Sequence, residues 1–250
     1  MKRARILHGG RPQWAELVDG DEGLRLGCGA LLTADDSAWL PPVMPGATIF
    51  ALGLNYADHS KELGFAKQDV PLVFLKGHKT FAGHQGVAPR PSDANQMHPE
   101  CELVAIIGRP TKKVGRHEAL DYVSGYTIAC DYAIREYLEN YYRPNLRVKN
   151  RDSATPIGPW IVDAGDIADP QALELETRVN GTQVQRGNTC DMVFDIATLV
   201  EYLSSFMTLF PGDMILTGTP HGVHFVSAGD QVVCSIGGIG NLSHRVVAQG

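Results

Sequence analysis

The sequence lacks the features of membrane-bound and exported proteins. Its 250 residues contain no apolar run near the roughly 20 residues that a transmembrane helix needs. Basic residues open the chain, but the hydrophobic stretch of a signal peptide does not follow them. We therefore expect a cytoplasmic protein with no membrane partner.

The sequence also lacks the marks of nucleotide and nucleic-acid binding. The formal net charge is −6, and no block of lysines and arginines with interleaved aromatic residues occurs. Because nucleic-acid binding depends on positive charge that neutralises phosphates, we expect no DNA or RNA partner. A G-x-G-x-x-G fingerprint is missing, and the Gly-Thr-Pro at 218–220 lacks the Walker spacing. A Rossmann or P-loop site is therefore not predicted.

Cysteine is scarce and scattered. The five cysteines are odd in number, widely spaced and without a C-x-x-C pair. This pattern argues against a disulfide framework or a zinc knuckle, and it fits a reducing compartment. We interpret all five as small buried hydrophobic residues; they are Cys28, Cys101, Cys130, Cys190 and Cys234.

Short strand signals dominate what is present. Apolar runs bounded by turn residues predict strands at 49–54, 72–75, 103–107, 126–130, 160–162, 173–179, 214–217 and 232–236. Asn180-Gly181 between apolar runs predicts a two-residue hairpin turn. Helical patterns are fewer and fall at 55–63, 132–142 and 196–206, with Asp195 as the N-cap of the last.

Many short strands with few helices predict a β-rich α+β fold. Residues 1–45 are punctuated by glycine and proline and end in a proline-rich boundary. We interpret them as a small β-rich N-terminal extension, and we expect residues 46–250 to form the catalytic domain.

Acidic residues stand where two predicted strands are buried. In a strand, residues two apart share a face, so Glu100 and Glu102 lie on the same side just before an apolar run. Asp131 follows a second apolar strand and supplies a third oxygen. Three carboxylates without clustered cysteine or paired histidine favour a hard cation such as Mg²⁺, Mn²⁺ or Ca²⁺ over zinc. An exposed acidic strand face is the alternative interpretation.

A histidine and a glutamate share one face of the predicted helix at 55–63. His59 and Glu62 are three residues apart and therefore lie side by side. A carboxylate beside an imidazole orients it and tunes its basicity, which suits a general acid/base pair. A polar surface helix is the alternative.

Two further segments suit an anionic ligand. Four arginines and a lysine fall within 135–151, and arginine forks bind carboxylates in pairs of hydrogen bonds. From this segment we predict Arg143 and Arg147 as substrate contacts; a solvated loop or a dimer contact is the alternative. The glycines around Thr219 allow backbone N–H groups to approach an anion, although a plain turn explains them equally well.

These clusters, in this order, resemble the fumarylacetoacetate hydrolase superfamily. The resemblance runs from about residue 48 to 247. It is carried by G-x-N-Y-x-x-H-x-x-E from Gly53 to Glu62, by the E-x-E strand, by Tyr126 with Asp131, and by the block from Gly212 to Val223. Segments 50–59, 130–149 and 206–213 narrow it to the isomerase/decarboxylase branch that acts in homoprotocatechuate (4-hydroxyphenylacetate) degradation. His221 and the loop His84-Gln85-Gly86 depart from the pattern, which puts the choice of substrate in doubt.

The resemblance implies a mixed β-sandwich roll with a few short helices and a homodimer, or a pairing with a homologous subunit. It also implies Mg²⁺ or Mn²⁺ on Glu100, Glu102 and Asp131, with Ca²⁺ as a substitute in crystals. Lys149 is implied to reach the site as a catalytic residue beside a lid helix that carries His59 and Glu62. Tyr56 and Thr219 join the two arginines as expected contacts of a small anionic oxo-acid.

The implied reaction is decarboxylation of 5-oxopent-3-ene-1,2,5-tricarboxylate and isomerisation of 2-hydroxyhepta-2,4-diene-1,7-dioate. Lys149 would add positive charge beside the enolate, and His59 with Glu62 would move the proton. An alternative function is hydrolysis of an acylpyruvate, with the same pair activating water. A third alternative is a metal-binding subunit without catalysis.

Overall fold

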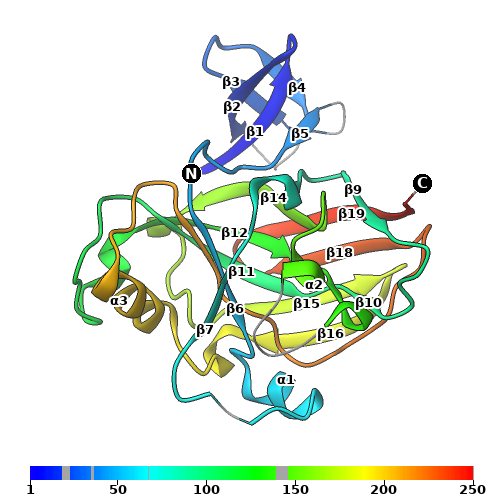
Figure 1. The fold of residues 1–250 in the computed structure, drawn as a ribbon. Helices are drawn as coiled ribbons and strands as arrows, with labels where there is room; N and C mark the ends of the chain where they lie inside the picture. The colour runs from blue at the N-terminus through cyan, green and yellow to red at the C-terminus, as the bar shows by residue number, and fades with distance from the viewer. Residues whose placement is uncertain (19–22, 35–36, 67, 139–145, 250) are drawn as a thin grey trace.

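Two β-sheets form the body of the molecule (Figure 1). The computed structural model describes residues 1–250 except 19–22, 35–36, 67, 139–145 and 250. Across these described residues it has a twelve-stranded sheet, a five-stranded sheet, a two-stranded ladder and three α-helices. The predicted β-rich α+β fold is confirmed.

The N-terminal strands form one end of the large sheet and project from the body in Figure 1. They are β1 (Lys2–His8), β2 (Arg11–Val18), β3 (Gly23–Leu26), β4 (Leu31–Thr33) and β5 (Ala38–Leu40). β1 pairs antiparallel with β14 (Thr155–Asp163). The extension predicted for residues 1–45 therefore continues the large sheet, and its standing as a separate unit stays a prediction.

The remaining strands of the large sheet are apolar, and they are mostly buried except for the last in the order, which lies at the sheet edge and is partly exposed. In the order β14-β12-β11-β17-β6-β7 they include β12 (Val123–Cys130), β11 (Cys101–Ile107), β17 (Met214–Leu216), β6 (Ile49–Gly53) and β7 (Leu72–Leu75); β8 (Phe81–Ala82) pairs with β14. All seven residues of β11 are buried. Successive side chains of β11 point to opposite faces of the sheet. Leu103 therefore packs in the main core, whereas Val104 and Ile106 pack in a second apolar cluster. Glu100 and Glu102 share the parity of this second cluster.

The five-stranded sheet covers the other face of the large sheet. Its order is β16 (Thr182–Asn188), β15 (Glu174–Val179), β18 (Gln231–Ile236), β19 (Gly240–Ala248) and β9 (Val87–Arg90). Burial alternates along β15 and β18, as expected for strands with one face in the core. Asn180 and Gly181 have φ of 51° and 81° and join β15 to β16, which confirms the predicted hairpin.

The described residues include three α-helices: α1 (Ala57–Glu62), α2 (Leu146–Lys149) and α3 (Ile196–Phe206). α3 matches its prediction, and Asp195 caps it by accepting a hydrogen bond from the Thr198 N–H. None of the described helices combines the length and the hydrophobicity that a bilayer crossing requires.

The helix predicted at 132–142 is wrong over its described part. Ala133–Ile134 is strand β13, which pairs with β10 (Met97–His98), and a short 3-10 turn covers Arg135–Tyr137. Residues 139–142 lie outside the described residues. Strand pairing supplies backbone partners to this segment, and that tertiary context overrides its helical pattern. Two of the cysteines, Cys28 and Cys190, are exposed and not buried as we predicted.

Candidate metal centre and active site

Three carboxylates converge beside the second apolar cluster. Glu100 directly precedes β11, Glu102 is its second residue, and Asp131 directly follows β12. The pairing of the two strands continues past their ends, because the Asp131 N–H donates to the Glu100 carbonyl at 2.9 Å. One oxygen from each carboxylate lies within 4.8 Å of the other two, and all three residues are buried. The geometry thus brings together the three residues that the sequence nominated as ligands.

The three carboxylates carry more negative charge than the adjacent lysines offset. Burial raises the pKa of Glu102 well above its ordinary value, and the nearby Asp131 raises it further; the Gly218 N–H, 2.7 Å from Oε2, opposes this rise. Burial acts in the same direction on Glu100, but Lys149, with smaller contributions from His98 and Arg135, outweighs it and brings the pKa of Glu100 down to about 2. Of these two glutamates, Glu102 is therefore the one whose negative charge the neighbouring groups compensate less.

Two buried lysines flank the carboxylates. Lys149 Nζ lies 2.5 Å from Glu100 Oε2 and 3.1 Å from Asp131 Oδ2. Lys76 Nζ donates to Asp131 Oδ1 at 2.7 Å. Burial lowers the pKa of Lys149, but Asp131 and Glu100 reverse the effect and leave it raised; for Lys76 burial wins and its pKa is lowered. Both ammonium groups pair with Glu100 or Asp131, and among the described residues Glu102 has no ion-pair partner.

The donor set fits a small hard cation. Within the described residues Asp131 Oδ2 is buried without a hydrogen-bond partner, although it is ion-paired to Lys149. An unbonded buried carboxylate oxygen is costly, and so is a buried Glu102 carboxylate without an ion-pair partner. Oxygen donors from three carboxylates suit Mg²⁺ or Mn²⁺. Glu100, Glu102 and Asp131 would hold such an ion.

A histidine and an arginine that our sequence analysis did not assign stand beside Glu100. Arg135 Nε donates to His98 Nε2 at 2.9 Å, and Arg135 Nη2 lies 3.5 Å from Glu100 Oε1. Burial lowers the pKa of His98 to about 3 despite Glu100, and Arg135 adds to the lowering. His98 is therefore neutral and accepts from the guanidinium, which it orients toward the carboxylates. His98 lies two residues before Glu100, and Arg135 lies four residues after Asp131. This closeness in sequence to the predicted ligands was the signal that could have identified both residues.

The predicted acid/base pair lies on α1, which also contacts the turn after β17. His59 is buried, and its Nδ1 is 3.0 Å from Glu62 Oε2. Glu62 also accepts from the N–H groups of Gly222 and Val223 at 3.0–3.2 Å. Although burial raises its pKa, these donors outweigh that effect and leave the pKa of Glu62 lowered. Glu62 therefore stays ionised beside His59.

A second contact joins α1 to the same turn. His221 Nδ1 lies 2.6 Å from Asp58 Oδ2, and both side chains are exposed. His221 is one of the positions at which the sequence departs from the family pattern. Its contact with Asp58 adds to the backbone bonds of Glu62, so α1 is tied to the 219–223 turn at two points.

The predicted substrate contacts divide into three groups. Tyr56 is fully buried, and its hydroxyl has no hydrogen-bond partner among the described residues; burial and the neighbouring Cys101 raise its pKa. The Thr219 hydroxyl donates to the Cys101 carbonyl at 2.9 Å and accepts from Gln185, so it already has structural partners. Arg147 is exposed and stacks on the Tyr137 ring at 4.1 Å, and Arg143 lies outside the described residues.

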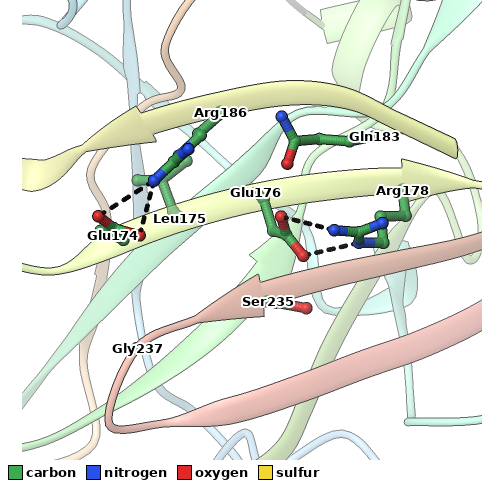
Figure 2. Close-up of a pocket in the computed structure, with 8 residues that line it drawn as sticks. All are labelled: Glu174, Leu175, Glu176, Arg178, Gln183, Arg186, Ser235 and Gly237. Atoms are coloured by element: carbon green, nitrogen blue, oxygen red, sulfur yellow. Dashed lines mark hydrogen bonds and ion pairs between the residues drawn. The ribbon is translucent and has the colours of Figure 1, made fainter.

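Two surface hollows formed by described residues are not lined by the three carboxylates. One of about 450 Å³ lies on the outer face of β15, β16 and β18, where Glu174 pairs with Arg186 and Glu176 with Arg178 (Figure 2). Another of about 350 Å³ includes Arg147 with Tyr137. The charges in Figure 2 are exposed and paired with each other, as is ordinary for a solvated strand face. The buried carboxylates have the chemistry of a site, and these hollows do not.

Comparison with known proteins agrees with this geometry. The family model described as fumarylacetoacetate (FAA) hydrolase C-terminal matches residues 48–247. The 4-hydroxyphenylacetate degradation bifunctional isomerase/decarboxylase of Salmonella dublin is 54% identical over 247 residues, which are 99% of this chain and 56% of that protein. The chain thus spans about half the length of the curated relatives that it matches first.

Solved structures with the same fold include two that inform the site. A 5-carboxymethyl-2-hydroxymuconate delta-isomerase from Mycobacterium smegmatis has 36% identity and a TM-score of 0.87 over 100% of both chains. A fumarylpyruvate hydrolase from Pseudomonas aeruginosa, in complex with Mn²⁺ and pyruvate, has 30% identity and a TM-score of 0.76 over 86% of this chain and 93% of that one.

Proposed function

The chain belongs to the fumarylacetoacetate hydrolase family, and from this premise we propose that it is a Mg²⁺- or Mn²⁺-dependent decarboxylase and isomerase. Its substrates are 5-oxopent-3-ene-1,2,5-tricarboxylate and 2-hydroxyhepta-2,4-diene-1,7-dioate, intermediates of 4-hydroxyphenylacetate catabolism. The observation that carries the proposal is the buried cluster of Glu100, Glu102 and Asp131, in which Lys149 contacts two of the carboxylates and Glu102 has no ion-pair partner among the described residues.

The metal-holding residues in this proposal are the three carboxylates. When bound, Mg²⁺ or Mn²⁺ supplies Lewis acidity that stabilises negative charge on the oxygens of a 2-oxo-carboxylate. Asp131 Oδ2 is free of hydrogen bonds within the described structure, and the Gly218 N–H donates to only one of the two oxygens of Glu102, Oε2. Both features support a role as oxygen ligands.

The positive side chains beside the cluster bind and orient an anionic substrate. Lys149 contributes an ammonium that burial has removed from water, so its field acts on nearby charge with little screening. Arg135 is a stronger choice than the exposed Arg147 for a carboxylate contact, and Arg143 stays a prediction. Arg135 already reaches Glu100, and His98 fixes its guanidinium.

The proton is moved by His59, and Glu62 is the residue that sets its tautomer. Because Glu62 stays ionised, His59 Nδ1 carries the hydrogen that Glu62 accepts, which leaves Nε2 to take up or give a proton. The bonds from Gly222 and Val223 keep Glu62 in place. Tyr56 adds a buried hydroxyl at the base of α1 that a substrate oxygen can engage.

Hydrolysis of an acylpyruvate is the second candidate function. It is favoured by the likeness to the fumarylpyruvate hydrolase, and the same His59–Glu62 pair would activate the water. We prefer decarboxylation because a relative that is 54% identical over 99% of this chain is named an isomerase/decarboxylase. A metal-binding subunit without catalysis predicts no turnover of either substrate.

One incubation separates these functions. Purified protein with Mg²⁺ is given the tricarboxylate or fumarylpyruvate, and CO₂ and pyruvate are followed together. We expect CO₂ from the tricarboxylate; pyruvate alone would favour the hydrolase. The His59→Ala variant is the control, because turnover that continues in it at the wild-type rate does not come from this site. Light scattering after gel filtration tests the expected homodimer, and a monomeric active enzyme would contradict it.

A further inference from the structure

Lys76 is a fully buried lysine that the reaction as proposed does not use. It directly follows the edge strand β7, and its side chain has no exposed surface. The ammonium donates to Asp131 Oδ1 at 2.7 Å and also to the carbonyl of Lys149. Burying an ammonium is costly unless a charged and hydrogen-bonded environment receives it. Both of its partners belong to the metal centre.

The first contact decides which oxygen of Asp131 is available. Oδ1 receives hydrogen bonds from Lys76 and, at 3.4 Å, from the Thr155 hydroxyl. Oδ2 receives none from the described residues and lies 3.1 Å from Lys149 Nζ. Lys76 therefore fixes the rotation of this carboxylate so that one oxygen serves as a ligand.

The second contact decides where Lys149 stands. Besides the Lys76 bond to its carbonyl, the next residue ties the same two segments together. Asn150 accepts from the Gly77 N–H at 2.8 Å and donates to the Leu75 carbonyl at 3.0 Å. The end of α2 is thus bound to residues 75–77, and the Lys149 ammonium reaches Glu100 from that fixed point.

We propose that Lys76 is a positioning residue for the metal centre. Its ammonium orients Asp131 and holds the end of α2, so that Asp131 and Lys149 stay in a fixed position relative to each other. This inference rests on the proposed metal site. A purely structural lysine would add to folding stability and leave cation binding unchanged. A charge that merely repels the cation would weaken binding, and its removal would tighten it.

The test compares Lys76→Met with Lys79→Met in the full chain. Methionine keeps most of the length of lysine but has no charge or donor. Lys79 is three residues away and exposed, so it controls for the general loss of one lysine. Mn²⁺ alone is titrated by calorimetry, thermal unfolding is recorded without metal, and hydrogen exchange is followed at residues 146–150.

Lys76→Met is expected to bind Mn²⁺ about 10- to 100-fold more weakly than the wild type, the range found when residues behind metal ligands are removed. Exchange at 146–150 is expected to become faster, while Lys79→Met changes neither quantity. If the methionine variant does not fold, Lys76→Gln carries the test, since its shorter amide still donates. It is then expected to fold without metal and to bind Mn²⁺ more weakly than the wild type.

Each outcome has one meaning. Unchanged or tighter Mn²⁺ binding by the folded variant overturns the inference and leaves the proposed function in place. Weaker binding with unchanged exchange at 146–150 also overturns it, because the hold on α2 is then missing. Wild-type protein that binds no Mn²⁺ overturns the inference and the proposed metal site together.

Discussion

Replacing Glu102 with glutamine should act in opposite directions on stability and on metal binding. Glu102 is 1% exposed, and its carboxylate supplies the negative charge that Lys76 and Lys149 do not offset. Glutamine has the same shape, and its carbonyl still accepts from the Gly218 N–H. The variant removes only the excess charge and one ligand.

Without metal, Glu102→Gln should be more stable than the wild type. Removing a poorly compensated buried charge contributes on the order of 2 kcal/mol, which is about 4–8 °C in Tm for a protein of this size. The gain should grow with pH. Burial and the nearby Asp131 raise the pKa of Glu102 in the folded state. The free energy of unfolding of the wild type is therefore highest below the ordinary carboxyl pKa and falls as the pH rises toward the folded pKa of Glu102.

With metal the order should reverse. Loss of a ligand should weaken Mn²⁺ binding by more than the ~100-fold that loss of a residue behind a ligand produces. Mn²⁺ should therefore raise the Tm of the wild type and not that of the variant. Scanning calorimetry at several pH values, with and without Mn²⁺, makes both measurements, and the exposed Glu16→Gln is the control. Lower metal-free stability together with unchanged Mn²⁺ affinity would refute the charge argument.

Three further variants test the groups around the carboxylates. His59→Ala should lower kcat about 10²- to 10⁴-fold through loss of acid/base transfer without changing Mn²⁺ affinity, whereas the exposed His117→Ala should change neither. Arg135→Met should raise KM about 10- to 100-fold, the value of a charged hydrogen bond; an unchanged KM would show that Arg135 does not contact substrate. His221→Ala removes an exposed hydrogen bond with Asp58, and kcat/KM should fall by no more than about five-fold. A larger loss would mean that α1 depends on this contact.

Features fixed by local chain geometry could be predicted from the sequence. Strand alternation placed Glu100 and Glu102 on one face, and the N-cap of α3 required only Asp195 and the residues after it. The hairpin at Asn180-Gly181 followed from two residues that tolerate positive φ. In each case the physical cause lies within a few residues of the feature.

Features that depend on distant contacts could not be predicted from these patterns. Residues 133–134 form a strand because β10, more than thirty residues earlier in the chain, pairs with them. Lys76 matters through Asp131 and through a carbonyl 73 positions later. Arg147 was predicted from local charge, but the same rule did not single out Arg135, which His98 orients. The position of Lys149 was known only through family resemblance.

Anomalous diffraction from crystals soaked in Mn²⁺ tests the central claim most directly. A bound ion that uses the oxygens of Glu100, Glu102 and Asp131 should give one strong peak among these three side chains, within about 2.0–2.3 Å of an oxygen from each. A map without a peak there, or with the three carboxylates turned apart and Mn²⁺ elsewhere, would contradict the account.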